Sequence, residues 1–205
     1  MKYTLYINDI PSGLIKSNQS LAIDTEAMGL NVLRDRLCLV QIGDESGAIY
    51  LVKFDGTDYS APNLRAMLLD ESIEKMFHFA RFDVAILRHY LNIPHIPSVF
   101  CTKIASKLSR TYTDAHGLKA ICKDLLGVEI SKESQSSNWG APTLTDRQLQ
   151  YAASDVIHLH KLKAILVDLL IQTGRMTLAR ELFQALHTIC TLDIVGFDAA
   201  DMINH

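Results

Sequence analysis

The sequence predicts an α/β domain in which helices flank a mixed β-sheet. Strand-like segments come early, strands then alternate with helical segments, and helices dominate the end of the chain. That order is typical of an α/β or α+β domain in which a hairpin is joined to crossover helices. The 205 residues are 48% apolar and 21% charged, which is enough apolar material for one full-sized core.

Three short strands are expected in the first quarter of the chain. Residues 21–23 are a buried-type apolar run that ends in acidic residues, and residues 37–42 and 48–52 are two further runs. Because the stretch 43–47 is rich in turn-forming residues, the second and third strands are expected to pair as a hairpin.

The remainder of the chain is expected to alternate strands with helices. Strands are predicted over 75–78 and 98–101. Helices are predicted over 62–69, where Pro62 suits the first turn, and over 82–91, 117–126 and 145–170, where apolar residues recur at helical spacing. Thr102 and Thr145 suit the N-caps of two helices. Roughly the last thirty residues are expected to form one more helix and an irregular tail.

The composition excludes several classes of protein. A net charge of −3 excludes a polybasic protein that coats nucleic acid by bulk charge. No apolar run approaches the roughly 18 to 20 residues that span a bilayer, and the N-terminus lacks a secretory signal, so we expect no membrane partner. The four cysteines are far apart, without a C-x-x-C pair, which indicates a cytoplasmic location.

Two acidic residues follow the first predicted strand. Side chains at positions i and i+2 of a strand point to the same face, so Asp24 and Glu26 are expected to project together. Two carboxylates this close repel each other unless a cation or a proton separates them. One interpretation is therefore a site for Mg²⁺ or Mn²⁺. The alternative is a strand that simply emerges into solvent.

Two later positions extend this acidic pattern. Asp83 lies where a strand gives way to a helix, where it either supports the first helical turn or adds a third carboxylate at the end of a strand. Tyr151 and Asp155 are four residues apart in a helical segment, so their side chains share one face. Small and apolar neighbours indicate that this face is partly buried, and a buried aspartate needs a partner.

Taken in chain order, D-x-E is followed by D and then by Y-x-x-x-D, a pattern that resembles the DEDD exonuclease superfamily in its tyrosine-bearing branch. The segments 78–83 and 150–155 are similar to the second and third motifs of that superfamily. Trp139 stands where ribonuclease D-like enzymes carry a tryptophan. The resemblance covers about residues 21–160 and implies a ribonuclease H-like fold, that is, a DnaQ-like 3′-5′ exonuclease domain.

A narrower resemblance extends over nearly the whole chain. The segments that carry it are similar to the nano-RNase C family of alphaproteobacteria, and they are 36–41, 99–108, 110–114, 116–119 and 135–139. Asn138 departs from the family, in which aspartate is usual, and the first twenty residues match poorly. The resemblance implies a 3′-5′ exoribonuclease that acts on RNA dinucleotides and other short single-stranded RNA. It also implies a ring-like homo-octamer.

The same resemblance sets the expected domain organisation. A single exonuclease domain is expected over 1–205, with a C-terminal helical segment over about 176–205. The helical nucleic-acid-binding (HRDC) domain that follows the catalytic domain in ribonuclease D is not expected in this chain.

Phosphodiester hydrolysis suggests a role for each acid. Two divalent ions, Mg²⁺ or Mn²⁺, roughly 3.5–4 Å apart would activate water and neutralise the phosphate. Asp24 is the candidate to bridge both ions, Glu26 and Asp155 would complete the shell of one ion, and Asp83 would serve the other. Because tyrosine has a pKa of about 10, Tyr151 is assigned to orienting the attacking water and not to removing its proton.

Substrate contacts are expected beside these acids. Met28, Gly29 and Leu30 follow Glu26 and would form an apolar wedge under a terminal base, or else pack as an ordinary loop. The other candidates close to the motifs are Thr25, His78, Phe82 and Trp139. His78 and Phe82 would serve equally well as core residues.

A basic segment is the expected phosphate entrance. Residues 103–123 hold five lysines and arginines against Asp114 alone. Lys107 and Arg110 follow Lys103 at helical spacing, and these two are the candidates for phosphate contacts. A solvated basic helix face is the alternative.

Two other functions compete with cleavage of short RNA. A broader 3′-5′ exonuclease that trims longer RNA or degrades DNA would use the same acids. A non-enzymatic nucleic-acid-binding module on this fold would be expected to lack one of the acids, and all are present.

Overall fold

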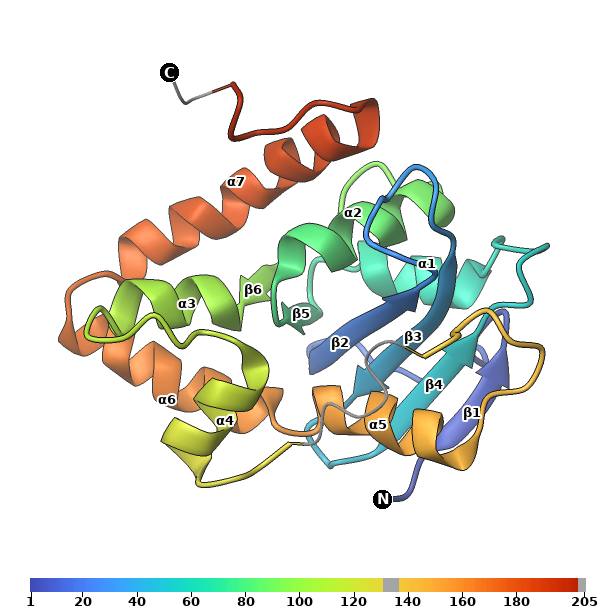
Figure 1. Ribbon diagram of the computed structural model, residues 1–205, viewed down its shortest axis with the longest axis horizontal. Helices are drawn as coiled ribbons and strands as arrows, with labels where there is room; N and C mark the ends of the chain where they lie inside the picture. The colour runs from blue at the N-terminus through green and yellow to red at the C-terminus, as the bar shows by residue number, and fades with distance from the viewer. Residues whose placement is uncertain (131–136, 203–205) are drawn as a thin grey trace.

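The computed structural model describes residues 1–130 and 137–202. A twisted six-stranded sheet runs through the molecule, with helices on both of its faces (Figure 1). Gln135 and Ser136, which contribute to the narrower resemblance, and the last three residues of the predicted C-terminal segment lie outside the described residues.

The sheet is mixed, as predicted. Its strands are β1 (Thr4–Ile7), β2 (Ser20–Ala27), β3 (Leu37–Gly43), β4 (Ile49–Lys53), β5 (Glu74–Phe77) and β6 (Val99–Cys101). They lie in the order β1-β4-β3-β2-β5-β6. The predicted hairpin is the antiparallel pair β3–β4, β2 is antiparallel to β3, and the remaining pairs are parallel.

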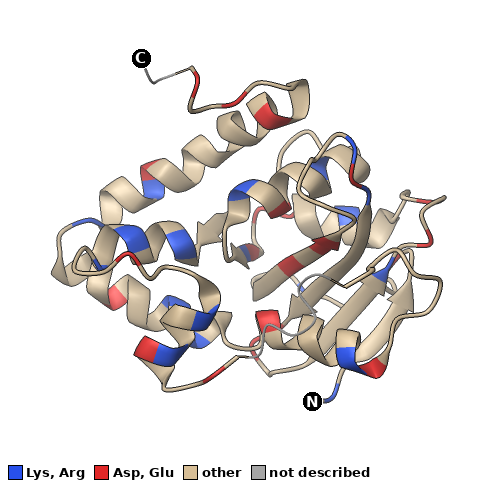
Figure 2. Ribbon diagram, viewed as in Figure 1, with Lys and Arg blue, Asp and Glu red and all other residues tan. Residues whose placement is uncertain are grey.

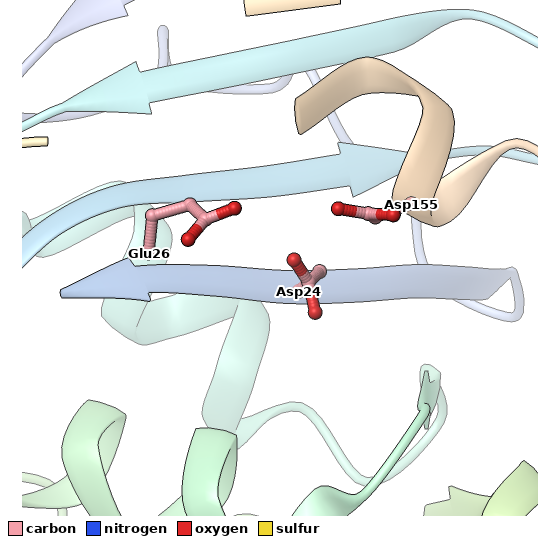
Figure 3. A group of neighbouring side chains, drawn as sticks. All are labelled: Asp24, Glu26 and Asp155. Atoms are coloured by element: carbon pink, nitrogen blue, oxygen red, sulfur yellow. The ribbon is translucent and has the colours of Figure 1, made fainter. Parts of the chain in front are cut away.

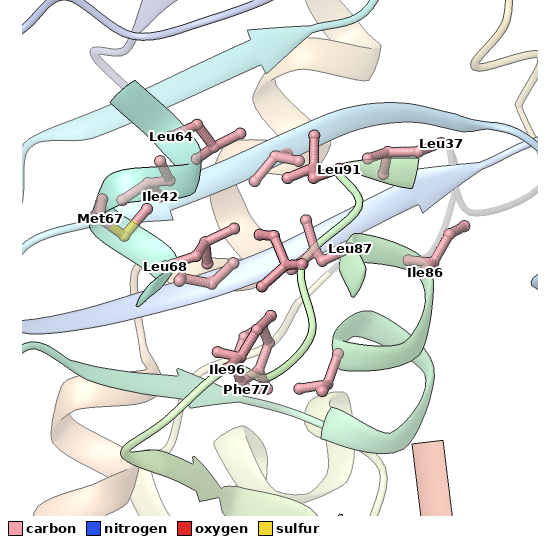
Figure 4. Close-up of a cluster of buried hydrophobic side chains, with 14 of the residues drawn as sticks. Leu37, Ile42, Leu64, Met67, Leu68, Phe77, Ile86, Leu87, Leu91 and Ile96 are labelled. Carbon is pink, nitrogen blue, oxygen red and sulfur yellow. The ribbon is translucent and has the colours of Figure 1, made fainter. Parts of the chain in front are cut away.

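One face of the sheet is covered by α1 (Pro62–Leu69), α2 (Ala80–Tyr90) and α7 (Met176–Val195). Their apolar side chains meet those of the sheet in a continuous core. Figure 4 shows Leu64 and Leu68 of α1 beside Leu87 of α2 and Leu91, the residue that follows this helix. All four leucines are fully buried. Each such burial stabilises the fold by about 1.5–3 kcal/mol, so these leucines hold the C-terminal end of α2 firmly against α1 and the sheet.

The opposite face is covered by α3 (Thr102–Ser109), α4 (Leu118–Leu126), α5 (Asp146–Val156) and α6 (Leu159–Gln172). The helix α5 lies across β2, β3 and β4, whereas α6 packs on α3 and α4 (Figure 1). These different neighbours explain why the predicted single helix over 145–170 is wrong, since the chain must turn at Ile157 and His158 to reach both.

The two predicted threonine caps have different outcomes. Thr145 caps α5 in a capping box with Gln148, as expected. The prediction for Thr102 is wrong, because Thr102 is the first residue of α3 and makes no cap hydrogen bond. Its hydroxyl instead lies 3.1 Å from the Phe77 carbonyl oxygen, to which it donates, and 2.9 Å from His78 Nδ1.

The N-terminal residues, which carry no motif, have a structural role. Strand β1 pairs in parallel with β4 at the edge of the sheet. The Asp9 carboxylate then accepts hydrogen bonds from the backbone N–H groups of Asn63 (3.0 Å) and Leu64 (2.8 Å) at the start of α1. These contacts satisfy donors that every helix leaves free at its N-terminus.

Among the residues that the structure describes, no helix combines the length and the apolar character needed to cross a membrane.

Candidate active site

Strand β2 carries the first two acids of the predicted site. Asp24 and Glu26 point to the face covered by α5, because alternate residues of a strand share a face. The pairing of β2 with β3 shifts register between Glu26 and Ala27. Such an irregularity bends a strand and re-aims its side chains, so β2 leaves the sheet directly after its acidic residues.

The helix α5 adds a third acid from the far end of the sequence. Asp24, Glu26 and Asp155 each offer a carboxylate oxygen, and these oxygens all lie within 4.8 Å of one another. Figure 3 shows Glu26 and Asp155 turned toward each other, with Asp24 close to both. One turn earlier on α5, Tyr151 lies close enough to Asp155 for that carboxylate to help raise the pKa of the Tyr151 hydroxyl. The side chains of the two local motifs, D-x-E and Y-x-x-x-D, thus come together at one site.

The fourth acid, Asp83, lies beside this cluster and not within it. It is 3% exposed in the first turn of α2 and accepts a 2.7 Å hydrogen bond from the Thr25 hydroxyl. Thr25 lies between Asp24 and Glu26 on β2 and points to the other face of the sheet. Asp83 therefore approaches the site from the α2 side, held by a residue of the acidic strand itself.

The electrostatics of the four acids follow from burial and mutual repulsion. Burial raises the pKa of Asp24 to about 7. Burial, together with repulsion from the other three acids, raises the pKa of Glu26 to about 10. Burial followed by repulsion from Asp24 also raises the pKa values of Asp83 and Asp155 well above their usual range. The folded chain therefore gathers four acids where water is scarce, and this environment favours their protonated, uncharged forms as long as no cation is bound.

Within residues 1–130 and 137–202, no ion pair relieves this repulsion. None of the ion pairs among the described residues involves the four acids. Figure 2 shows acidic positions on β2 and at the nearby end of α5 close to the centre of the molecule, with basic positions of α3 and α4 to one side. A set of carboxylate oxygens without a protein counter-ion is the donor set that hard divalent cations such as Mg²⁺ prefer. The residues present therefore fit a divalent metal ion.

The acids open into a cavity of about 630 Å³. Of the predicted substrate contacts, those that line it are Thr25, Met28, Gly29, Leu30, His78, Phe82 and Trp139. Met28 is 49% exposed and Leu30 is 85% exposed, so the loop after β2 presents apolar side chains to a ligand. Trp139 is buried, with its ring centroid 6.1 Å from that of Tyr151.

Close packing holds the loop that carries Met28 and Leu30. A side chain added at Gly29 would meet Asp35, and one added at Gly140 would meet the sulfur of Met28 and the guanidinium of Arg36. That guanidinium also donates a 3.0 Å hydrogen bond to the Gly140 carbonyl oxygen. The loop after β2 and the segment next to Trp139 are thereby fastened together across the cavity.

His78 is uncharged in this environment. Burial, and to a smaller extent the nearby charge of Lys103, lowers the pKa of His78 to about 3. Its Nδ1 lies 2.9 Å from the Thr102 hydroxyl. The neutral ring therefore lines the cavity without adding positive charge.

The expected phosphate contacts require correction. The Arg110 side chain is only 1% exposed, and its guanidinium is bound to Asp124 (2.6 Å), to the Ser106 hydroxyl and to the Ala115 carbonyl oxygen. It has no surface left for a phosphate, so this prediction is wrong. Lys107 is exposed on α3 but lies outside the cavity lining, so the structure does not support its assignment either.

Two other lysines line the cavity, where Lys107 and Arg110 were expected to contact phosphates. Lys103 and Lys119 are the two cationic side chains among the described residues that line the cavity. The Lys103 ammonium lies 4.0 Å above the ring of Phe79, which is 47% exposed and has a left-handed backbone with φ of 71°. The basic segment and the motif over 78–83 pointed to these stretches, but sequence alone does not tell which residues face the cavity.

The chain belongs to the 3′-5′ exonuclease family, which matches its residues 9–171. It is 36% identical to DNA polymerase I of Aquifex aeolicus over 156 residues, which are 76% of this chain and 25% of that protein. It is 32% identical to ribonuclease D of Gluconacetobacter diazotrophicus over 158 residues, which are 76% of this chain and 39% of that protein. The chain thus spans about a quarter to two-fifths of the length of these curated relatives.

A smaller nuclease matches the chain along its whole length. The structure of Brucella melitensis NrnC with bound Mg²⁺ has 47% sequence identity and a TM-score of 0.92, with 100% of both chains covered. The same protein bound to pGG has 48% identity and a TM-score of 0.91, also with both chains covered completely. These matches confirm the predicted ribonuclease H-like fold and the DEDD, ribonuclease D-like resemblance.

Proposed function

We propose that this chain is a metal-dependent 3′-5′ exoribonuclease that hydrolyses RNA dinucleotides and other short oligoribonucleotides to 5′-mononucleotides. The observation that carries the proposal is the convergence of carboxylate oxygens of Asp24, Glu26 and Asp155 within 4.8 Å, in a cavity that Asp83 and Tyr151 also line. The complex of the similar Brucella NrnC with pGG supports a dinucleotide as the substrate.

The four acids are assigned to holding two divalent ions, Mg²⁺ or Mn²⁺. Asp24 lies close to both Glu26 and Asp155, which suits a shared ligand, and Asp83 completes the set from the α2 side. When bound, such ions acidify water and neutralise the charge of the phosphate. The acids must release the protons that burial makes them retain, so metal binding and proton release are coupled.

Tyr151 is assigned to orienting the attacking water. Burial and the surrounding carboxylates raise its pKa above the usual value for tyrosine, so the hydroxyl keeps its proton at neutral pH. A hydroxyl that stays protonated donates and accepts hydrogen bonds but does not act as a general base. This environment agrees with the role expected from the sequence.

The cavity suits a short substrate. Its volume of about 630 Å³ lies within the range of small-molecule sites, roughly 300–1,000 Å³. Met28 and Leu30 offer apolar surface to a base, Phe79 offers an aromatic ring, and Lys103 and Lys119 offer charge to phosphates. Stacking is insensitive to base identity, so we expect weak sequence preference.

A broader exonuclease is the second candidate, favoured by the relationship to DNA polymerase I and ribonuclease D. A time course on a labelled 5′-phosphorylated RNA dinucleotide, with Mg²⁺, Mn²⁺ and EDTA arms, tests the main proposal. Parallel courses on a longer RNA and on duplex DNA separate the two candidates. We expect fastest turnover of the dinucleotide and none in EDTA, whereas equal or slower dinucleotide cleavage favours the broader enzyme.

The assembly and the cellular location are also proposed. We propose a ring-like homo-octamer of single-domain chains, with residues 1–205 forming the exonuclease domain and about 176–205 its C-terminal helical segment. Exposed apolar side chains on α7, namely Leu178 and Leu182, support a subunit contact there. Light scattering tests the octamer, and a monomer contradicts it. A cytoplasmic location agrees with short RNA as the substrate.

A further inference from the structure

Gln41 is an amide buried in an apolar strand. All seven residues of β3 are buried, and Gln41 is 0% exposed among leucine, valine and isoleucine side chains. Burying an amide without complete hydrogen bonding costs roughly 1–3 kcal/mol, and the Gln41 Oε1 atom has no hydrogen-bond partner among the described residues. An apolar residue would pack here at lower cost, so the amide requires an explanation outside the core.

The other end of this amide reaches the acidic cluster. Gln41 stands directly opposite Asp24 in the antiparallel pairing of β2 and β3, where facing side chains lie close together. Its Nε2 donates a 3.2 Å hydrogen bond to Asp24 Oδ2. If the amide were rotated by about 180°, Gln41 Oε1 would face the Asp24 carboxylate oxygen, and two hydrogen-bond acceptors would meet. The orientation with Nε2 toward Asp24 is therefore the favourable one.

Gln41 is distinguished from its neighbours by this position. Glu26, the other acid on this face of β2, stands opposite Leu39, and Thr25 stands opposite Val40. Asp24 is thus the acid of β2 with a polar cross-strand partner. The terminal torsion of an aspartate side chain is soft, so without a donor its carboxylate rotates over a broad range.

An uncharged donor is suited to this place. A lysine opposite Asp24 would form an ion pair and compete with a bound cation, and a glutamate would add a further negative charge to the cluster. An amide restricts the carboxylate without neutralising it. The hydroxyl of Thr25 does the same for Asp83, with a 2.7 Å hydrogen bond.

We propose that Gln41 is a positioning residue that fixes the rotation of the Asp24 carboxylate, so that its oxygens face Glu26 and Asp155 and the cluster is ready to receive a divalent cation. This inference rests on the proposed function for its biological meaning, but it concerns metal affinity and is measurable without RNA. Residues that orient metal ligands typically account for about 10–100-fold in affinity or activity.

The test compares two methionine variants of the full-length protein. Gln41→Met removes the donor and keeps the side-chain length. Leu51→Met changes the residue that pairs with Gln41 on β4, which is equally buried and is not among the residues lining the cavity. Mn²⁺ binding is followed by electron paramagnetic resonance, thermal unfolding is recorded with and without Mn²⁺, and cleavage is measured over a range of Mn²⁺ concentrations.

We expect Gln41→Met to bind Mn²⁺ about 10-fold or more weakly than the wild type. The Mn²⁺ concentration for half-maximal cleavage should rise by the same factor, and saturating Mn²⁺ should restore kcat to within about threefold. Leu51→Met should bind Mn²⁺ as the wild type does. If Gln41→Met does not fold, Gln41→Asn, whose amide is one methylene shorter, should show the same loss of affinity.

Mn²⁺ affinity of a folded Gln41 variant within about twofold of the wild type overturns the proposal. A loss of stability or kcat with unchanged Mn²⁺ affinity overturns it as well, because that result indicates a purely structural amide. If the wild type binds Mn²⁺ but cleaves no RNA, the proposed function fails, while the binding comparison still decides the role of Gln41.

Discussion

Two regions of this molecule bury charge in opposite ways. The Arg110 guanidinium is buried with a complete set of partners. They are Asp124, the hydroxyls of Ser106 and Tyr112, and the Ala115 carbonyl oxygen. The cluster of Asp24, Glu26 and Asp155 is partly buried and makes no ion pair with the described part of the chain. Folding alone satisfies the first region, whereas the second needs a ligand that the described part of the chain does not supply.

The hydrogen bonds of the acids strengthen this contrast. Gln41 donates to Asp24, and Thr25 donates to Asp83. Each of these partners is uncharged. The chain therefore orients its buried acids and leaves their charge available, which is the arrangement expected of a cation site and not of a structural salt bridge.

The largest effect is expected when one acid is neutralised. Asp24→Asn or Asp155→Asn removes a charged ligand whose metal contributes several kcal/mol to the transition state, so RNA cleavage should fall on the order of 10³-fold. The metal-free protein should become more stable, with Tm rising by roughly 2–4 °C for each kcal/mol of repulsion removed. A cleavage assay and thermal unfolding in EDTA check both results.

Asp146→Asn is the matched control for this experiment. Asp146 belongs to the same helix as Asp155 but is exposed and lies outside the cavity. Its replacement should leave cleavage unchanged. Undiminished cleavage in Asp24→Asn or Asp155→Asn would remove the assignment of these acids.

The second-largest effect is expected on stability, when the buried Arg110 guanidinium is removed. Arg110→Met breaks a buried, fully bonded guanidinium, so the free energy of unfolding should fall by about 3 kcal/mol and Tm by roughly 6–12 °C. At a temperature where the variant is folded, its kcat should stay close to that of the wild type. Asp124→Asn should cost less, because that side chain is 47% exposed. A variant with normal stability and lost activity would show that Arg110 serves the substrate.

The sequence was sufficient where local spacing decides the geometry. Asp24 and Glu26 share a face because strands alternate, and Tyr151 and Asp155 share a face because of the helical repeat. The hairpin of β3 and β4 and the capping box at Thr145 follow from equally local signals. Their convergence at one point depends on sheet order, which the family resemblance supplied and the spacing alone did not.

The sequence was insufficient where tertiary packing decides. Arg110 has the local pattern of a solvated basic residue, yet Asp124 and the turn after α3 enclose it. Strand β1 is short, mostly exposed and lacks strong alternation, so no local pattern predicts it. Whether Lys103 or Lys107 reaches the cavity depends on where α2 places Phe79. No sequence motif marks Gln41, because its proposed role depends on its pairing with Asp24 on the neighbouring strand.

A smaller effect, on substrate binding, is expected when the charge of Lys103 in the cavity is removed. Lys103→Met should raise the KM for a 5′-phosphorylated dinucleotide about 10-fold with kcat within about twofold, because the lysine binds ground state and transition state alike. The salt dependence of binding should weaken by about one phosphate contact. Lys107→Met, one helical turn away and outside the cavity lining, is the control and should change neither quantity. Equal effects of the two variants would indicate long-range attraction instead of contact.

The smallest effect is expected when the pH is changed. We expect the acidic cluster, and not the region of Arg110, to make the free energy of unfolding depend on pH. The folded pKa values of Asp24 (about 7) and Glu26 (about 10) lie above those of the unfolded chain, so the folded cluster retains protons that the unfolded chain has released. The free energy of unfolding of the metal-free protein should therefore fall as pH rises, on the order of 1 kcal/mol between pH 7 and pH 8.

Saturating Mg²⁺ should abolish this fall, because the metal binds the deprotonated acids and stabilises the folded state. Lys75, whose pKa is lowered to about 8 by burial, acts in the opposite direction at higher pH, which is why the window ends there. Urea unfolding at pH 7 and pH 8 gives the change in the free energy of unfolding, once in EDTA and once in Mg²⁺. Groups remote from the metal contribute equally to both changes, so the difference between the two reports the acids that bind the metal. Glu26→Gln should reduce the fall in EDTA, because one of the four acids with a raised pKa is then missing, and Arg110→Met should retain all of it. A pH dependence that Mg²⁺ leaves untouched would mean that the buried acids are not where the cation binds.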